Sequence, residues 1–384
     1  MFRFLHTADW QIGRPFAMVE GDAAARLRQA RVEAIDRIGG LATDQGAGVV
    51  LVAGDVYDAE GLTNTTLLAP LERMRRYPQI NWYLLPGNHD PDRQEGIWDR
   101  LAKLGLPANV LAVREAAPVH LAEEAWLLPS PLVSRALGDD PTAWCDDAPT
   151  PEGAIRVGLA HGSIRDFGDS AAGLRAPLAA DRAERAGLAY LALGDWHRTQ
   201  RINARTWYSG TPEPDRFVAP GEVAIGQVLA VSIAGPGAIP DIQPLESGFH
   251  RWAELEADLH ERADVDALES HVRQLDSDPA RLYLRLRARG ALSLADRAYF
   301  DARIGEALRA AVLALELEDA ALAGKPDTDD LDLIDKPGGV LRLAAERLAA
   351  LAADPQATEA WAARRALAML FGHVRAAADQ GRGS

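Results

Sequence analysis

Five short apolar runs of the sequence end in residues that can bind metal ions. In chain order, these residues are Asp9 with Gln11, Asp55 with Asp58, Asn88 with His89, His161, and Asp195 with His197. Carboxylate and amide oxygens mixed with imidazole nitrogens suit Mn²⁺, Fe²⁺ or Zn²⁺ better than Ca²⁺. A single polar turn after a strand is an ordinary surface feature, but five in order indicate a metal centre.

The apolar runs that precede these residues are predicted to be buried β-strands. They cover Phe2–Ala8, Val49–Ala53, Trp82–Leu85, Ile155–Ala160 and Leu188–Leu193. Helices are expected over about 23–42 and 66–77, so the first part of the chain has the order β-α-β-α-β. That order implies parallel pairing and a layered α/β core, in which the carboxyl ends of the strands meet at one edge.

The rest of the chain changes in character. Trp207–Pro212 and Val223–Ile233 are predicted to be closing strands of a second sheet, and Gly235, Pro236 and Gly237 indicate that this domain ends near residue 248. Leu282, Leu284 and Leu286 alternate with polar residues, which is typical of a half-buried strand.

A helix over Leu294–Ala311 and a strand ending near Glu318 would then complete a small β-α-β unit. An acidic segment, Gly324–Gly339, precedes two helices with an apolar stripe. That stripe either docks a partner or packs on its own domain.

Composition limits the class of protein. The 384 residues carry a net charge of −15, from 41 basic and 56 acidic side chains, which argues against a basic surface for nonspecific binding of nucleic acid. The negative net charge does not exclude a locally positive groove. Cys145 is the sole cysteine, the apolar runs are too short to span a membrane, and Met1–Leu5 begins a strand rather than a signal peptide. We therefore expect a cytoplasmic protein without a membrane partner.

The order of the motifs resembles that of the calcineurin-like metallophosphoesterases. Three segments are similar to the SbcD-type DNA-repair exonuclease branch of that family: His6–Trp10, Gly54–Asp58 and Tyr208–Pro212. The resemblance covers about residues 1–248 and implies a layered α-β-β-α sandwich as the catalytic domain. By the same resemblance, residues 249–323 would form a small α/β capping domain, and residues 324–384 an acidic linker with partner-binding C-terminal helices.

The resemblance also implies a role for each site residue. The first of two divalent cations would be held by Asp9, Asp55 and His197, with Gln11 where the family has a histidine. The second would be held by Asp55, Asn88 and His161, with Asp195 at the other substituted histidine. Mn²⁺ is the expected ion, and Mg²⁺, Fe²⁺ and Zn²⁺ stay open.

Two further residues would take part in catalysis. The resemblance implies that His89 faces the scissile phosphate as the catalytic acid and that Asp58 orients its ring. Four arginines close to the motifs could grip phosphates or could be solvated loop residues: Arg14, Arg93, Arg165 and Arg198. The substitutions Gln11 and Asp195 indicate either a subgroup with retuned metal preference or a partly decayed site.

The function that this implies is hydrolysis of phosphodiester bonds by a metal-dependent DNA nuclease, an SbcD-like exonuclease subunit. The resemblance further implies a partner ATPase with a long coiled coil, bound through the C-terminal helices, and a homodimer. Two alternatives stay open: a phosphodiesterase or phosphatase acting on small phosphate esters or nucleotides, and a metal-poor scaffold that regulates the ATPase.

Overall fold

The computed structural model describes residues 1–122, 124–134, 139–164, 177–218, 225–354 and 356–381. The chain divides into two compact units, Met1–His250 and Arg251–Ser384, and each is described by itself. The division into three domains inferred from the sequence stays a prediction.

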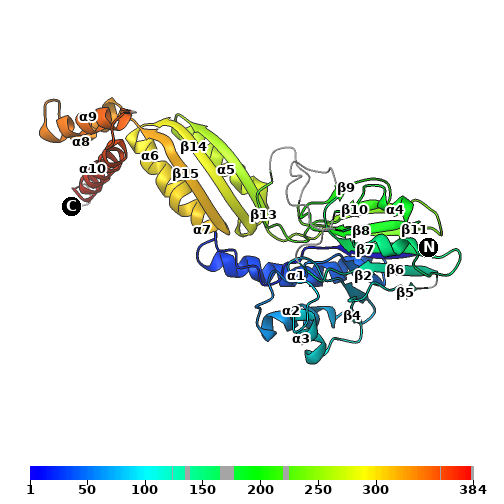
Figure 1. The fold of residues 1–384 in the computed structure, drawn as a ribbon. Helices are drawn as coiled ribbons and strands as arrows, with labels where there is room; N and C mark the ends of the chain where they lie inside the picture. Colours follow the sequence, from blue (N-terminus) through cyan, green and yellow to red (C-terminus); the bar gives the residue numbers. More distant parts are fainter. Residues whose placement is uncertain (123, 135–138, 165–176, 219–224, 355, 382–384) are drawn as a thin grey trace. The chain divides into compact units, whose positions relative to one another are not determined.

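The first unit contains two six-stranded sheets (Figure 1). In the first sheet the order is β12-β11-β1-β2-β3-β4, and the strands β1 to β4 are parallel. Their bounds are β1 Phe2–Thr7, β2 Val49–Val52, β3 Asn81–Leu84, β4 Val110–Ala112, β11 Gln227–Ile233 and β12 Asp241–Glu246. The helices α1 (Asp22–Asp44), α2 (Asn64–Met74) and α3 (Ile97–Leu104) connect its parallel strands.

The second sheet has the order β5-β6-β7-β8-β10-β9, with β6, β7, β8 and β10 parallel. Its strands are β5 Val119–Ala122, β6 Ala125–Ser130, β7 Ile155–His161, β8 Tyr190–Gly194, β9 Gln200–Arg201 and β10 Thr206–Tyr208. A short helix, α4 (Arg182–Arg185), and a 3₁₀ turn at Ala143–Asp146 lie outside this sheet.

Alternate side chains of the strands enter two different cores. In β2, Val50 and Val52 pack with the helices α1 to α3, whereas Val49 and Leu51 pack against the second sheet. Both faces of β2 are therefore buried, which explains why its sequence is apolar without interruption. A third core lies beneath α4 on the outer face of the second sheet. The predicted layered α-β-β-α fold is confirmed.

One sheet assignment was wrong. The strand expected over Val223–Ile233 is β11, and it pairs antiparallel with β1 in the first sheet rather than closing the second. The first two residues of the expected range lie outside the described residues. The strand β12, which the sequence analysis did not anticipate, extends the same sheet. An apolar segment can add to the edge of either sheet, so its place depends on contacts with distant strands.

The second unit is built on a parallel three-stranded sheet, β13-β14-β15. Its strands are β13 Arg251–Leu259, β14 Leu282–Leu292 and β15 Ala314–Gly324. The helix α5 (Arg262–Leu275) links the first pair, and α6 (Leu294–Phe300) continues through a π-helical stretch, Asp301–Leu308, into α7 (Arg309–Ala311). The expected β-α-β unit is observed, and it is preceded by β13 and α5, which were not predicted.

Three helices complete the second unit: α8 (Thr328–Ile334), α9 (Val340–Ala353) and α10 (Ala360–Gly381). The segment expected to be a linker thus contains α8, whose start is stabilised by reciprocal hydrogen bonds between Asp327 and Asp330. Leu367 and Phe371 of α10 pack with Leu294 of α6. Among the described residues, we find no helix that is both long and apolar enough to cross a membrane.

Candidate metal centre

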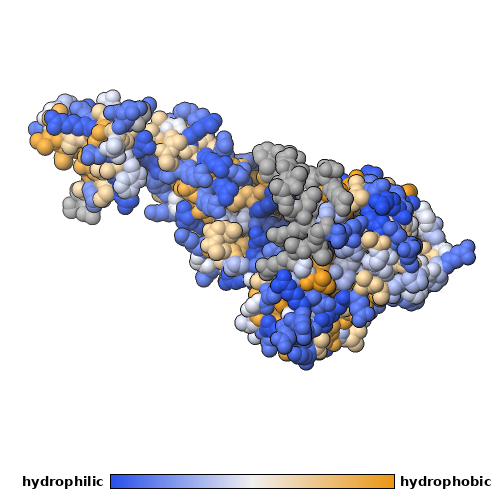
Figure 2. All heavy atoms as spheres, viewed as in Figure 1, coloured by the Kyte–Doolittle hydropathy of each residue, from blue (hydrophilic) through white to orange (hydrophobic). Residues whose placement is uncertain are grey.

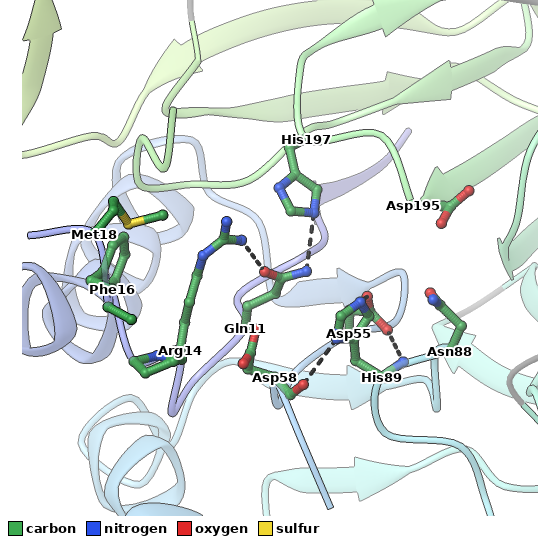
Figure 3. A pocket seen from close by; sticks show the side chains of 12 residues that line it. Gln11, Arg14, Phe16, Met18, Asp55, Asp58, Asn88, His89, Asp195 and His197 are labelled. Atoms are coloured by element: carbon green, nitrogen blue, oxygen red, sulfur yellow. Dashed lines mark hydrogen bonds and ion pairs between the residues drawn. The ribbon is translucent and has the colours of Figure 1, made fainter. Parts of the chain in front are cut away.

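The site is built from the loops that follow five strands, three in the first sheet and two in the second. β1 leads to Asp9, β2 to Asp55, β3 to Asn88, β7 ends in His161, and β8 leads to Asp195. Two main-chain hydrogen bonds join the first two loops, Asp9 N–H to Gly54 O at 3.1 Å and Gln11 N–H to Asp55 O at 2.9 Å. Figure 3 shows the side chains that line the pocket at this site, among them Asp55, Asn88 and Asp195.

Four of the predicted ligands have a left-handed backbone. The φ angles are 54° at Asp9, 43° at Gln11, 53° at Asp55 and 104° at Asp195. Such a backbone is uncommon outside glycine and costs about 1–3 kcal/mol per residue, so it persists where the surroundings require it. Its concentration at these positions is typical of a functional site.

Glycines let the loops approach each other closely. A Cβ atom on Gly87 would lie 2.2 Å from Asp55 Oδ1, and one on Gly54 would lie 2.3 Å from His161 Nδ1. Any side chain in place of these two glycines would overlap with the Asp55 carboxylate or the His161 imidazole, so glycine is required at both positions.

Asp9, Asp55 and His161 form a buried cluster whose potential ligand atoms all lie within 4.8 Å of one another. His161 Nε2 lies 2.7 Å from Asn88 Oδ1, 3.5 Å from Asp55 Oδ1 and 3.8 Å from Asp195 Oδ1. Ligands about 2.1 Å from an octahedral ion lie about 3 Å from their neighbours. These oxygens and this nitrogen therefore fit a divalent cation.

The orientation of His161 is set by its other ring nitrogen. Nδ1 lies 2.8 Å from the carbonyl oxygen of Ala53, and because a carbonyl can only accept, Nδ1–H donates. The Nε2 atom is thereby directed at the cluster. A metal-binding histidine commonly makes this kind of hydrogen bond.

His197 lies beside Asp9 of the cluster. Its Nε2 lies 4.0 Å from Asp9 Oδ1 and 3.0 Å from Gln11 Nε2. Its Nδ1–H donates to Asp215 at 2.6 Å. Arg14 donates to Gln11 Oε1 at 2.5 Å, so the side chain of Gln11 lies between a guanidinium and an imidazole (Figure 3).

His89 lies at the rim of the cluster with 39% of its side chain exposed. Its Nε2 is 4.0 Å from Asp55 Oδ2, and its main-chain N–H donates to Asp55 Oδ1 at 2.9 Å. Asp58 was expected to orient this ring, and it contacts the ring through its main chain. The ring Nδ1–H donates to the main-chain carbonyl of Asp58 at 2.9 Å, so the loop backbone holds the ring.

Asp90 holds the loop that carries these residues. It is fully buried, and its carboxylate accepts from Gly87 N–H at 2.7 Å and from Tyr57 N–H at 3.0 Å. Burial and the charge of Asp55 raise its pKa well above the usual value, although the two N–H donors oppose this.

The crowding of carboxylates shifts the pKa of the ligands. Burial raises the pKa of Asp9 to about 6, against the opposing charges of His197 and His161. Burial alone would lower the pKa of His161, but the charges of Asp55, Asp9 and Asp195 raise it to about 9. The pKa of His197 is raised in the same way, because Asp215 and Asp9 outweigh the effect of burial. A bound cation would favour the deprotonated form of all three.

Asp215 belongs to the site and was missed from the sequence. It is buried, and its Oδ2 contacts His197, Arg14 at 2.9 Å and Arg31 at 3.4 Å. Burial opposes ionisation, but these partners lower the pKa of Asp215 far below its usual range. Asp215 lies seven residues after the end of β10 rather than directly after it, so the pattern used for the other ligands does not find it. Its closeness to the Tyr208–Pro212 motif was the available signal.

The arginines proposed to bind substrate have different surroundings. Arg14 is held by Gln11 and Asp215, Arg93 pairs with Glu60 at 3.1 Å, and the guanidinium of Arg198 lies 5.2 Å from the ring centre of Trp196. Of these three, Arg14 lines the pocket at the site. Arg165 lies outside the described residues.

A pocket of about 410 Å³ opens over the cluster. Its polar wall includes Asp55, Asn88, His89, Asp195 and His197, and Phe16, Ala17 and Met18 form its apolar wall. Figure 3 shows Phe16 and Met18 on the side of Arg14, away from Asn88. The pocket therefore offers one surface to a charged group and another to an apolar group.

Comparisons with known proteins agree with this chemistry for the first part of the chain. Residues 2–168 match the family model described as calcineurin-like phosphoesterase. The matched segment carries Asp9, Asp55, Asn88 and His161, whereas Asp195 and His197 lie beyond it.

No match was found among curated proteins. Among solved structures, the chain is similar to the Thermus thermophilus protein TT1561, at 12% identity and a TM-score of 0.39 over 64% of this chain and 99% of that one.

Proposed function

We propose that this chain, which is similar to calcineurin-like phosphoesterases over residues 2–168, is a metal-dependent DNA nuclease. In this proposal it hydrolyses phosphodiester bonds as an SbcD-like exonuclease subunit in DNA repair. The observation that carries the proposal is the convergence of Asp9, Asp55 and His161 beneath the exposed ring of His89.

Asp9, Asp55, Asn88 and His161 would hold the metal, with Asp195 beside them. A divalent cation bound there would polarise a phosphoryl oxygen and lower the pKa of bound water. The four residues place their oxygen and nitrogen atoms around one point and keep water out from beneath it. Oxygen atoms predominate among them, and this supports Mn²⁺ or Mg²⁺.

His89 is the candidate catalytic acid. Its Nδ1–H is used by the Asp58 carbonyl, which leaves Nε2 as the ring atom available to a bound ester. When that nitrogen carries a proton, it can donate to the leaving alkoxide or to a phosphoryl oxygen. The Asp58 backbone limits rotation of the ring, so it positions the proton.

The choice of DNA as substrate is supported by the segments that resemble the exonuclease branch, His6–Trp10, Gly54–Asp58 and Tyr208–Pro212. Arg93 and Arg198 would contact phosphates beyond the scissile one. Both are near the motifs in sequence, and Arg93 is 43% exposed although it pairs with Glu60.

A second candidate function is hydrolysis of small phosphate esters or nucleotides. The apolar wall of Phe16 and Met18 in the pocket of about 410 Å³ favours this alternative. Such a wall suits one base or aryl group rather than a long polymer.

The test is a hydrolysis assay in Mn²⁺ and in Mg²⁺, on end-labelled DNA and on a chromogenic phosphodiester. We expect cleavage of both substrates in Mn²⁺, and we expect His89→Ala to reduce turnover by about 10²–10⁴-fold while metal binding persists.

Cleavage of the small ester alone, even with the partner ATPase and ATP, would exclude the nuclease. An unchanged rate in the His89→Ala protein would exclude His89 as the catalytic acid. Absence of hydrolysis in excess Mn²⁺, with no metal bound, would instead favour the metal-poor scaffold.

We also propose a partner ATPase with a long coiled coil, bound by the C-terminal helices, and a homodimer formed through the first unit. Exposed apolar side chains support the first of these: Val340, Leu341, Leu343, Trp361 and Met369. Figure 2 shows hydrophobic residues at the surface of the part that Figure 1 labels α8 and α9. Sedimentation of the protein as a monomer at micromolar concentration would contradict the dimer.

A further inference from the structure

The hydrogen bonds around His161 differ from those around His197, and this difference bears on how many ions the site can bind. We propose that the site binds one divalent cation tightly, beside His161, and that Arg14, acting through Gln11, takes the place of a second cation beside His197. The inference rests on the proposed metal-dependent function and goes beyond it.

On the His161 side, two atoms that attract cations face each other. The Nε2 atom, with Nδ1–H donating to Ala53 O, lies 2.7 Å from the Oδ1 atom of Asn88. Asp55 Oδ1 lies 3.5 Å from the same nitrogen. Either a proton or a metal ion on Nε2 would satisfy these oxygens, and the spacing suits neighbouring ligands of one ion.

On the His197 side, the corresponding nitrogen faces a donor. A guanidinium can only donate, so the Gln11 atom bonded to Arg14 must be the oxygen Oε1. The NH₂ group of Gln11 is therefore the one directed at His197 Nε2, at 3.0 Å. With Nδ1–H donating to Asp215, the lone pair of Nε2 is satisfied by this amide, and a metal ion at the same place would face N–H protons.

Charge supports the same assignment. Asp215, the carboxylate behind His197, is paired with Arg14 at 2.9 Å and with Arg31 at 3.4 Å. These two cations already neutralise that side of the site, and Arg14 would repel a divalent ion bound next to Gln11.

Rotation of the Gln11 side chain away from His197 would carry a cost. Gln11 is buried, so turning it would leave its amide or the Arg14 guanidinium without a partner. A second ion must displace these hydrogen bonds before it can bind. We therefore expect its affinity to be at least about tenfold below that of the first ion.

The experiment counts bound ions in the full-length protein after chelation and dialysis. Mn²⁺ is titrated by calorimetry, and the loaded protein is studied by electron paramagnetic resonance. We expect one Mn²⁺ per chain in the tight phase and the spectrum of isolated ions. Two ions of similar affinity with a spin-coupled spectrum would overturn the inference, although the proposed hydrolase could still stand.

The two histidines provide a matched pair of variants. His161→Asn should weaken the tight ion by more than about 100-fold, which exceeds the usual effect of losing a supporting partner. His197→Asn should leave the affinity of that ion within about threefold. Loss of the tight ion in the His197→Asn protein would contradict the assignment.

Gln11→His provides a gain-of-binding test that does not depend on a loss of folding. The substitution removes the amide and supplies an imidazole nitrogen beside His197, so we expect a second Mn²⁺ per chain. A stoichiometry that stays at one would show that Gln11 is not what excludes the second ion. Absence of any bound ion in the unaltered protein would count against the proposed function as well.

Discussion

At the scale of single residues, the chemistry depends on which ring nitrogen of each histidine is already used. His161 donates through Nδ1 to the Ala53 carbonyl, His197 to Asp215, and His89 to the Asp58 carbonyl. In all three, Nε2 is the nitrogen directed at the centre or the pocket. Two main-chain carbonyls and the Asp215 carboxylate therefore set the orientation of the three imidazole rings. The sequence shows that these residues are histidines, but not which way their rings point.

Asp215 should be important for stability as well as for the orientation of His197. Asp215→Asn would leave the fully buried Arg31 without its closest opposing charge, so we expect the free energy of unfolding to fall by about 3–5 kcal/mol. Urea denaturation measures the change. The matched control is Glu60→Gln, which breaks the exposed pair with Arg93 and should cost about 1 kcal/mol or less. An equal loss of unfolding free energy in the two variants would contradict the expectation that the buried ion pair contributes more than the exposed one.

Metal affinity should rise with pH. The carboxylates around His161 raise its pKa to about 9, so near neutral pH a proton competes with the cation for Nε2. Asp9, with a pKa of about 6, is already ionised above pH 7. We expect the Mn²⁺ association constant to increase up to about tenfold per pH unit from pH 7 to pH 9 and then level off. A constant affinity in calorimetric titrations across this range would contradict His161 as a ligand.

At the scale of elements, the centre exists because parallel strands end together. Asp9, Asp55 and Asn88 leave the carboxyl ends of β1, β2 and β3 in one sheet, while His161 ends β7 in the other. The turns are tight enough that Asp9 and Asp55 adopt a left-handed backbone and that glycines are needed opposite Asp55 and His161. The strain in these loops is offset by the buried sheets on which they are anchored.

Gly87→Ala should therefore disrupt the centre. The added Cβ would lie 2.2 Å from Asp55 Oδ1 and 2.3 Å from Asp55 N, and main-chain atoms cannot easily move away. We expect tight Mn²⁺ binding to fall by more than about 100-fold, measured by equilibrium dialysis.

The control is Gly40→Ala, within α1, where an added Cβ meets nothing within 4 Å. There we expect normal metal binding and a gain of about 0.5–1 kcal/mol in stability, because alanine favours the helix. Normal Mn²⁺ binding by the Gly87→Ala protein would contradict the close packing described for these loops.

At the scale of the whole molecule, the charged surface of the second unit bears on which partner it could bind. In the second unit, the arginines of β14 lie between acidic residues of β13 and β15: Arg285 pairs with Glu316 at 2.7 Å, and Arg287 pairs with Glu254 and Glu318. These positive charges are neutralised within their own sheet. The arginine content of this face therefore gives no reason to expect it to bind DNA.

The apolar residues of α9 and α10 are the part of the second unit best suited to a protein partner. Trp361 and Met369 are 71% and 55% exposed, so alanine there should not disturb the core. If the proposed coiled-coil ATPase binds here, the Trp361→Ala, Met369→Ala double variant should recover at least about tenfold less of it in affinity purification with mass spectrometry. Leu111→Ala, at an exposed position of the first unit, is the control. Equal recovery by all forms would exclude this surface.

The sequence by itself was enough to determine where the five strands that carry the site end, and the layered order of strands and helices around them. Apolar runs such as Val49–Val52 are local signals, and a strand that is apolar throughout must be covered on both faces. Each polar cluster directly follows its strand, so the order of candidate ligands could be read without knowing how the sheets pack.

Only the tertiary structure decided which groups those ligands face. Gln11 and His197 are 186 residues apart, and Arg14 reaches Asp215 across 201 residues. Contacts over such separations depend on how two sheets meet, which no local pattern records. For the same reason, the sequence analysis placed β11 in the wrong sheet, overlooked Asp215, and could treat Gln11 only as a weaker ligand rather than as the partner of Arg14 and His197.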